Sequence, residues 1–172
     1  SEDMNYAPLG MGGTNGGITT KESAAAFAIF GNGGKYYRPV TFVEIYDQLG
    51  NLIVSNKPAP SVALSEDTAT IMNHMLQNVV YGSDGTGRKA AAYLPNYKIF
   101  AKTGTSDAAN DLWFVGGTPY YVASTWCGFD TPQGISSSTV ALRMWGSAMS
   151  KIHSKLPAKE FTDSEYVQCK LF

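Results

Sequence analysis

Three strand-like segments follow one another between residues 97 and 129, and they constrain the fold more than any other feature of the sequence. The first ends in the run IFAKTGT, the second is LWFVGGT (112–118), and the third is YYVASTWCGF (120–129). Their β-branched and aromatic residues favour extended backbone, and the links between the segments are short. The sequence therefore predicts an antiparallel sheet of three consecutive strands.

Helices are predicted on both sides of these strands in the sequence. Thr19-Thr-Lys-Glu22 has the form of a capping box, which satisfies free amide donors at a helix start. The alanine-rich run that follows ends at Gly33 and Gly34. A second helix is expected from Ser65 to Gly82, with one buried face formed by Ile71, Met72, Met75, Leu76, Val79 and Val80. Helices around an antiparallel sheet predict an α+β fold.

Two further elements complete this prediction. An amphipathic helix is expected near residues 137–153, with an apolar face formed by Ala141, Leu142, Trp145, Ala148, Met149 and Ile152. The run YYRPVTFVEIY (36–46) predicts a strand, and DQLGN before LIV predicts a hairpin turn and a return strand. Pro39 indicates a sheet edge or a strand start, because proline cannot donate to a strand ladder.

Composition excludes several classes of function. The 172 residues carry 13 basic and 14 acidic side chains, so no overall field would attract nucleic acid or an anionic membrane. No apolar run approaches the ~20 residues that cross a bilayer, and the first ten residues lack the pattern of a signal peptide. Cys127 and Cys169 have no spacing typical of a metal site, and Cys127 is expected to be a buried free thiol.

The glycine clusters and the histidines do not fit a cofactor or metal site. The segment Gly82–Lys89 has two glycines at phosphate-loop spacing, but Arg88 stands where the lysine belongs. The overlapping G-x-G-x-x-A pattern follows a helix instead of a strand, so we expect a flexible turn here and no bound nucleotide. His74 and His153 lack partners at metal spacing, and both are expected on solvated helix faces. No metal and no cofactor are predicted.

The run Lys102-Thr-Gly-Thr105 carries the most specific chemistry. A lysine that protects a sheet edge, followed by threonines that favour strands, is one interpretation. The other is that Gly104 leaves room for an extended peptide, while the ammonium, hydroxyls and exposed amides hold a carboxylate or a developing oxyanion. That combination is typical of acyl transfer. Strict alternation places Lys102 opposite Thr103 and Thr105, so one shared cleft requires a position at the rim of the sheet.

Four pieces of sequence around this run resemble one known family. In order they are Lys102-Thr-Gly-Thr105, Asp111-x-Trp113-Phe-Val-Gly116, Thr118-Pro119 and Trp126-x-Gly-Phe-Asp130. Their order and spacing are similar to those of the C-terminal half of the transpeptidase domain of penicillin-binding proteins. The residues of the second piece resemble the bifunctional class A branch. The resemblance implies that residues 1–172 are the C-terminal part of such a domain, with part of the serine β-lactamase and penicillin-binding transpeptidase fold.

The resemblance also implies an activity and a set of roles. The family acylates a serine with a D-Ala-D-Ala stem peptide and transfers it to an amine, which cross-links peptidoglycan; β-lactams mimic that substrate. The family's catalytic positions correspond here to Lys102 and Thr105. The lysine would support proton transfer, and the amide of Thr105 would form half of an oxyanion hole. Substrate binding corresponds to Thr103, Gly104 and Thr105. The resemblance places the protein at the outer face of the bacterial cytoplasmic membrane, anchored by a segment outside this chain.

The chain departs from the family pattern in one respect. The family needs Ser-x-x-Lys and Ser-x-Asn before the lysine motif, and no serine here fits either pattern. Thr86-Gly-Arg-Lys89 comes nearest to the Ser-x-x-Lys pattern, but it lacks the serine. We expect the nucleophile in an N-terminal part of the domain that this chain lacks, so the isolated chain is predicted to be inactive. The apolar faces of the helix at 137–153 and of the alanine-rich helix are expected to lack cover in this chain. They are expected to bind that part as a separate chain or to form a dimer.

Two alternatives to a transpeptidase stay open at this point. A serine β-lactamase or D,D-carboxypeptidase of the same superfamily would share the motif and differ in how fast the acyl-enzyme is hydrolysed. A non-catalytic sensor or scaffold would keep the peptide-binding strand and lack the serine altogether.

Overall fold

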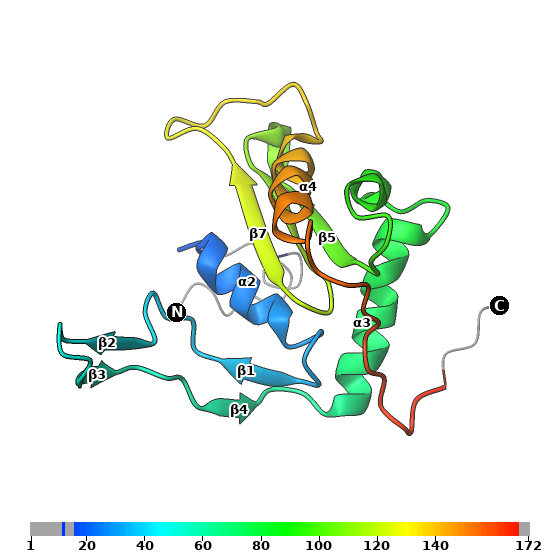
Figure 1. Cartoon of the computed structure of the whole chain (residues 1–172). Helices are drawn as coiled ribbons and strands as arrows, with labels where there is room; N and C mark the ends of the chain where they lie inside the picture. The colour runs from blue at the N-terminus through cyan, green and yellow to red at the C-terminus, as the bar shows by residue number, and fades with distance from the viewer. Residues whose placement is uncertain (1–11, 13–15, 169–172) are drawn as a thin grey trace.

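The three predicted strands form one antiparallel sheet in the computed structural model, which describes residue 12 and residues 16–168. They are β5 (Phe100–Thr105), β6 (Leu112–Gly117) and β7 (Val122–Cys127), in the spatial order β5-β6-β7. The register pairs Lys102 with Val115 and Gly104 with Trp113. The predicted α+β class, the three strands and their antiparallel pairing are confirmed (Figure 1).

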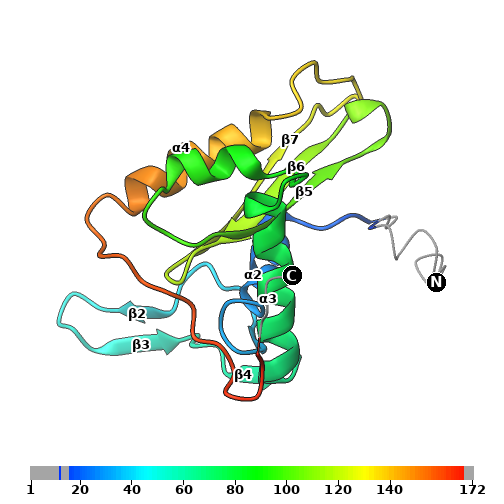
Figure 2. The ribbon, with the colours of Figure 1, turned by 90° about the vertical axis from the view of Figure 1, so that its right-hand side faces the viewer.

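Helices cover both faces of this sheet (Figure 2). Helix α4 (Val140–Ile152) packs on β6 and β7 and also contacts the 3₁₀ helix η2 (Arg88–Tyr93). Helix α2 (Thr20–Ala28) lies against the opposite face, and α3 (Glu66–Tyr81) packs beside β5. A further 3₁₀ turn, η3 (Asp107–Ala109), links β5 to β6.

The main core lies between the sheet and α4. Trp145 is fully buried, its ring meets that of Phe114 edge-on at 5.1 Å, and its Nε1 donates to the carbonyls of Gly116 and Ala123 at 3.2 Å each. This tryptophan therefore ties α4 to two neighbouring strands through both apolar contact and hydrogen bonds.

The expectation that the α4 face lacks cover in this chain is wrong. Sheet residues and η2 bury four of its six predicted apolar residues: Ala141, Leu142, Trp145 and Met149. Ala148 and Ile152, the other two, are exposed. The strands β6 and β7 together with η2 therefore cover this part of the α4 face within the chain.

The predicted start of α2 and both predicted ends of α3 are confirmed, whereas α2 ends at Ala28, before the predicted Gly33 and Gly34. The Thr19 hydroxyl accepts from the Glu22 amide, and the Glu22 carboxylate accepts from the Thr19 amide at 2.9 Å, which completes the capping box. Hydrogen bonds from the Thr19 amide and hydroxyl to the carboxylate hold the pKa of Glu22 below its usual value. Gly34 has φ +83°, and a side chain there would lie 2.2 Å from the Leu64 carbonyl, so only glycine fits this exit from α2.

The predicted buried face of α3 is confirmed for Leu76 and Val80 and wrong for Ile71 and Met75. Its buried residues are Ala69, Thr70, Asn73, Leu76 and Val80. Ile71 and Met75 are 47% and 58% exposed. Hydrophobic periodicity misplaced the face because polar side chains on the buried side find hydrogen-bond partners elsewhere in the fold.

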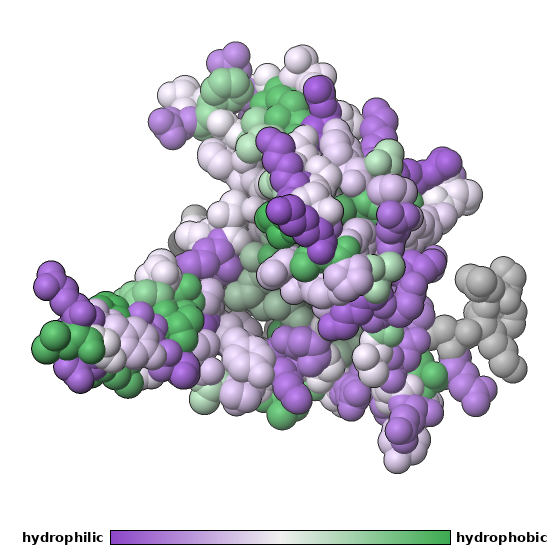
Figure 3. Space-filling model, viewed as in Figure 1, coloured by the Kyte–Doolittle hydropathy of each residue, from purple (hydrophilic) through white to green (hydrophobic). Residues whose placement is uncertain are grey.

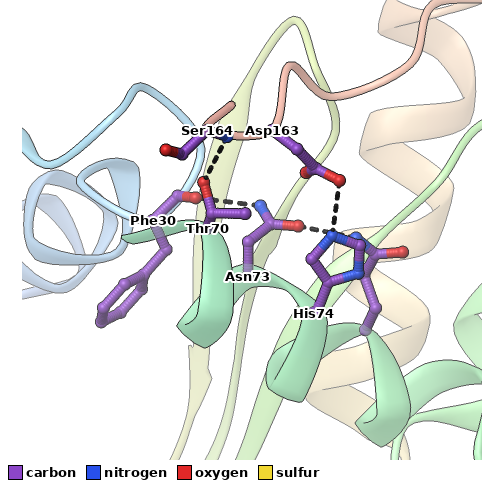
Figure 4. Close-up of polar contacts among 7 residues, drawn as sticks. Phe30, Thr70, Asn73, His74, Asp163 and Ser164 are labelled. Atoms are coloured by element: carbon purple, nitrogen blue, oxygen red, sulfur yellow. Dashed lines mark hydrogen bonds and ion pairs between the residues drawn. The ribbon is translucent and has the colours of Figure 1, made fainter. Parts of the chain in front are cut away.

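Those partners come from the segment after α4, residues 154–168, which we call the C-terminal strap (Figure 4). The Ser164 amide donates to the Thr70 hydroxyl at 3.0 Å, and Asp163 lies 2.8 Å from His74 Nε2. From the end of α2, the Phe30 carbonyl accepts from the Asn73 side chain at 2.9 Å. The buried side of α3 is therefore held by polar contacts that are distant in sequence.

The predicted strand over 36–46 is wrong in length. It is divided into β1 (Lys35–Tyr37), which pairs with β4 (Pro60–Val62), and β2 (Glu44–Tyr46), which pairs with β3 (Leu52–Ser55). The break spans residues 38–43 and contains Pro39. The predicted hairpin is confirmed as β2 and β3, which extend away from the body (Figure 1). Apolar side chains cover this projecting hairpin (Figure 3): Phe42, Val43, Ile45, Leu49, Leu52, Ile53 and Val54 are all exposed.

The prediction for the histidines is wrong for His153, which is only 3% exposed. Its Nε2 lies 2.7 Å from the Thr118 hydroxyl and its Nδ1 lies 2.8 Å from the Met149 carbonyl. His74 is partly exposed and pairs with Asp163. Cys127 is a free, half-buried thiol, whereas Cys169 lies outside the described residues, as does most of the glycine-rich segment before α2.

Two features are absent from the described residues. No helix among them has the length and apolarity that a bilayer crossing requires. In the same part of the chain, no group of three or more histidine, cysteine, aspartate or glutamate side chains could hold a metal ion.

Candidate active site

The predicted motif lies on an open edge of the sheet. Among the strands that the structure describes, β5 pairs with β6 alone. The Ser106 amide donates to the Asp111 carbonyl at 3.1 Å, which continues the ladder one step beyond Thr105. Because antiparallel pairing alternates along a strand, the peptide groups of Lys102 and Gly104 point to β6, and those of Thr103 and Thr105 point to the open edge.

The lysine side chain reaches the same edge. Lys102 and Thr105 are exposed, and Thr103 and Gly104 are half-buried. Lys102 Nζ donates to the Thr103 carbonyl at 2.8 Å, so the ammonium lies beside peptide groups that the ladder leaves free. Strand alternation still places the Cβ of Lys102 opposite that of Thr103. The side chain bends over the rim, which is the geometry that a shared cleft requires.

A compact turn fixes the end of β5. The Asp111 carboxylate accepts from the Ser106 hydroxyl at 2.9 Å and from Trp126 Nε1 at 2.9 Å. The Asp111 amide donates to the Ser106 hydroxyl at 2.8 Å. Two residues of this turn, Ala108 and Ala109, have positive φ values of 56° and 54°. The aspartate of the second motif piece is thus a brace between strands that holds Thr105 in place.

The remaining motif residues have packing roles. A Cβ at Gly128 would lie 2.2 Å from Trp126 Cζ2, so the glycine lets the indole fold back over the strand end. A Cβ at Gly104 would lie 3.0 Å from the Cβ of Trp113, its cross-strand neighbour. Gly104 therefore relieves crowding within the sheet, which is a second reason for a glycine besides room for a peptide.

The start of β5 is anchored by the last residue of α3. The Tyr81 hydroxyl donates to the Tyr97 carbonyl at 3.0 Å and accepts from the Ile99 amide at 3.1 Å. Burial raises the pKa of Tyr81, and Lys98 Nζ lies 5.3 Å from the centre of its ring. The strand that carries the motif is consequently fixed at both ends.

One residue at this site was missed by sequence reasoning. The Thr86 hydroxyl lies 2.8 Å from the Thr103 hydroxyl, although the two are 17 residues apart. In the sequence, Thr86 stands out only as the first residue of an incomplete nucleophile motif. The two glycines that flank it were the available signal, because they permit a tight turn after a helix.

Two cavities among the described residues lie away from the motif. One of about 450 Å³ lies between α2 and the turn from β6 to β7, and it is lined by residues that include Lys21, Ala25 and Tyr121. Another of about 260 Å³ lies near Glu66 and Lys159. Neither is lined by any residue from Lys102 to Thr105.

Comparison with known proteins bears on this site. A family model described as the penicillin binding protein transpeptidase domain matches residues 3–134. Penicillin-binding protein 1A of Clostridium botulinum (strain Langeland, type F) is 38% identical over 159 residues, which are 91% of this chain and 19% of that protein. The Aquifex aeolicus protein of the same name is 31% identical over 160 residues, 91% of this chain and 21% of that protein. The chain thus spans about a fifth of these relatives' length.

Solved structures share the fold. Penicillin-binding protein 1A from Haemophilus influenzae matches with a TM-score of 0.74 at 22% identity, covering 84% of this chain and 28% of that one. The D,D-transpeptidase domain of a peptidoglycan glycosyltransferase from Eggerthella lenta matches with a TM-score of 0.64 at 24% identity, covering 81% of this chain and 33% of that one. The predicted partial transpeptidase fold is confirmed by these matches.

Proposed function

The chain belongs to the penicillin-binding protein transpeptidase family, and from this premise we propose that it is the C-terminal part of a peptidoglycan D,D-transpeptidase that works through an acyl-serine. The observation that carries the proposal is the open edge of β5, where the ammonium of Lys102 and the peptide groups of Thr103 and Thr105 come together. An extended peptide can add to such an edge through main-chain hydrogen bonds.

Each residue of the motif has a role in this proposal. The free amide of Thr105 donates to the oxyanion that forms when the serine attacks; the loss of one such donor costs about 3 kcal/mol of transition-state stabilisation. The hydroxyls of Thr103 and Thr105 hold the terminal carboxylate of the D-Ala-D-Ala peptide. Lys102 positions the substrate and supports proton transfer. A β-lactam carries a similar carboxylate and would occupy the same edge.

The nucleophile comes from outside this chain. No serine here has a lysine three residues later or an asparagine two residues later. We therefore propose that an N-terminal part of the same domain supplies the serine, either in one polypeptide or as a separate chain, and that this chain alone is inactive. The complete protein would act at the outer face of the bacterial cytoplasmic membrane, where its substrate is assembled.

Labelling with a fluorescent penicillin tests the proposal. The 172-residue chain is expected to remain unlabelled, and the longer source protein is expected to form a covalent adduct that survives denaturation. Covalent labelling of the short chain would overturn the proposed absence of a nucleophile. A longer protein that never reacts would overturn the enzymatic function, and rapid release of the label by hydrolysis would indicate a β-lactamase or carboxypeptidase instead.

A further inference from the structure

The loop between α3 and η2, residues 82–87, brings a hydroxyl from outside the sheet to the motif strand. Resting on the proposed function, we propose that Thr86 is a positioning residue: it donates a hydrogen bond to Thr103 and so directs the Thr103 hydroxyl proton toward the carboxylate of the bound peptide or β-lactam. The contact that carries this inference is the 2.8 Å distance between the two hydroxyl oxygens.

The loop is held in place by its own backbone. The Gly82 amide donates to the Asn78 carbonyl at 2.8 Å, and the Gly87 amide donates to the Val79 carbonyl at 2.9 Å. Arg88 Nη1 donates to the Ser83 carbonyl at 2.8 Å and closes the loop from outside. Two of these bonds use carbonyls from the last turn of α3. The turn is therefore fixed at both ends, and the expectation of a flexible turn is wrong.

The two glycines determine which side chain the loop presents. A Cβ at Gly85 would lie 2.4 Å from the Val79 carbonyl oxygen, so the loop packs directly on the last turn of α3. A Cβ at Gly87 would lie 3.4 Å from the ring of Phe114, which is the cross-strand partner of Thr103. Thr86 lies between Gly85, which must lack a side chain, and Gly87, where a side chain would be crowded, and it is therefore aimed at the strand by backbone packing.

The chemistry of the pair sets the direction of the hydrogen bond. A hydroxyl has one proton to donate and two lone pairs to accept with. If Thr103 donates its proton to an anionic carboxylate, then it must accept from Thr86, and Thr86 must be the donor. Such a chain of two hydroxyls strengthens the outer hydrogen bond and stops the Thr103 proton from turning to a backbone carbonyl. The expected effect is on carboxylate binding and not on the chemical step.

The test uses the longer source protein with Thr86→Val and Thr86→Ser, reacted with benzylpenicillin in rapid-mixing experiments that separate the initial dissociation constant from the acylation rate constant. For Thr86→Val, we expect the dissociation constant to rise about five- to tenfold, the effect of losing one hydrogen bond to a polar ligand. The acylation rate constant should stay within about twofold, since the serine and the oxyanion donors are unchanged. Thr86→Ser keeps the hydroxyl and should restore binding.

Two controls separate positioning from general damage. Thr162→Val changes an exposed threonine of the C-terminal strap and should alter neither constant. The methyl ester of benzylpenicillin lacks the anionic carboxylate, so it should bind the wild-type protein and Thr86→Val equally. A dissociation constant that is unchanged in Thr86→Val, or a Thr86→Ser variant that binds as weakly as Thr86→Val, would overturn the role of Thr86 while leaving the proposed function intact. A wild-type protein that is never acylated would overturn both.

Discussion

The sheet body, made of β5, β6, β7 and α4, and the projecting hairpin use similar side chains in opposite ways. Leu142 in α4 is 4% exposed, whereas Leu49 at the hairpin turn is 87% exposed. In the body, α4 lies along the sheet (Figure 2), and apolar side chains from the two meet and exclude water. In the hairpin, apolar side chains face solvent along both strands (Figure 3). The two regions must therefore be stabilised by different forces.

Local polar contacts hold the hairpin together. Asp47 Oδ1 accepts from the amides of Leu49 and Asn51 at 2.8 Å each, and Gly50 has a φ of +84° that suits the turn. Lys57 Nζ pairs with Glu44 at 2.7 Å across the strands. The hairpin shape is therefore determined by neighbours in sequence, whereas the body depends on contacts between distant segments. Substitutions in the two regions should separate these causes.

The largest effect is expected from Leu142→Ala in the body. It removes a buried side chain between α4 and the sheet, and such truncations lower the free energy of unfolding by about 2–5 kcal/mol. Urea unfolding followed by tryptophan fluorescence measures the loss, because Trp145 lies in the same core. A loss below about 1 kcal/mol would show that this core is not what stabilises the body.

A smaller effect is expected from Gly128→Ala at the end of β7. The added methyl group would lie 2.2 Å from Trp126 Cζ2, so the indole must move away from Asp111. Overpacking of this kind lowers the free energy of unfolding by about 1–3 kcal/mol. Thermal unfolding measures it, and Gly16→Ala, where a Cβ meets no atom within 4 Å, is the control. Equal unfolding temperatures for the two variants would contradict the proposed brace.

Leu49→Ala, the same substitution as in the body, should change the free energy of unfolding by no more than about 0.5 kcal/mol. The reason is that an exposed side chain leaves little apolar surface to lose and no cavity to create. The urea experiment that measures Leu142→Ala provides the comparison. A loss approaching that of Leu142→Ala would mean that the hairpin is buried in solution and that the two regions are not different after all.

The smallest effect is expected from acid acting on the hairpin turn. Hydrogen bonds from the Asn51 side chain and amide hold the pKa of Asp47 below its ordinary value of 3.8. A lowered pKa contributes stability above the unfolded value, and that stability is lost as the pH falls through the lower folded value. Chemical shifts of the Leu49 and Asn51 amides should move toward random-coil values over this range. Asp47→Asn should abolish the pH dependence, and a titration unchanged by that variant would assign it to another group.

The sequence predicted those parts of the fold that neighbouring residues determine. The three strands, the hairpin turn and the helix caps depend on patterns a few residues long, and all were confirmed. The buried face of α3 and the burial of His153 could not be predicted, because their partners lie in distant segments such as the C-terminal strap. At the candidate site, the motif from Lys102 to Thr105 was recognisable in sequence. Its contact with Thr86 was not, because tertiary packing of a loop creates it.

The C-terminal strap also has a consequence for how the polypeptide reaches its final form during synthesis. Ser164 bonds to Asp67 and Thr70 across 97 and 94 positions, and Asp163 pairs with His74 across 89. Helix α3 therefore leaves the ribosome long before the residues that clasp it are translated. Contacts between such remote positions form slowly, because the intervening chain must first be ordered. Docking of the strap is expected to be a late event. Until it occurs, part of the polar side of α3 remains exposed in the nascent chain.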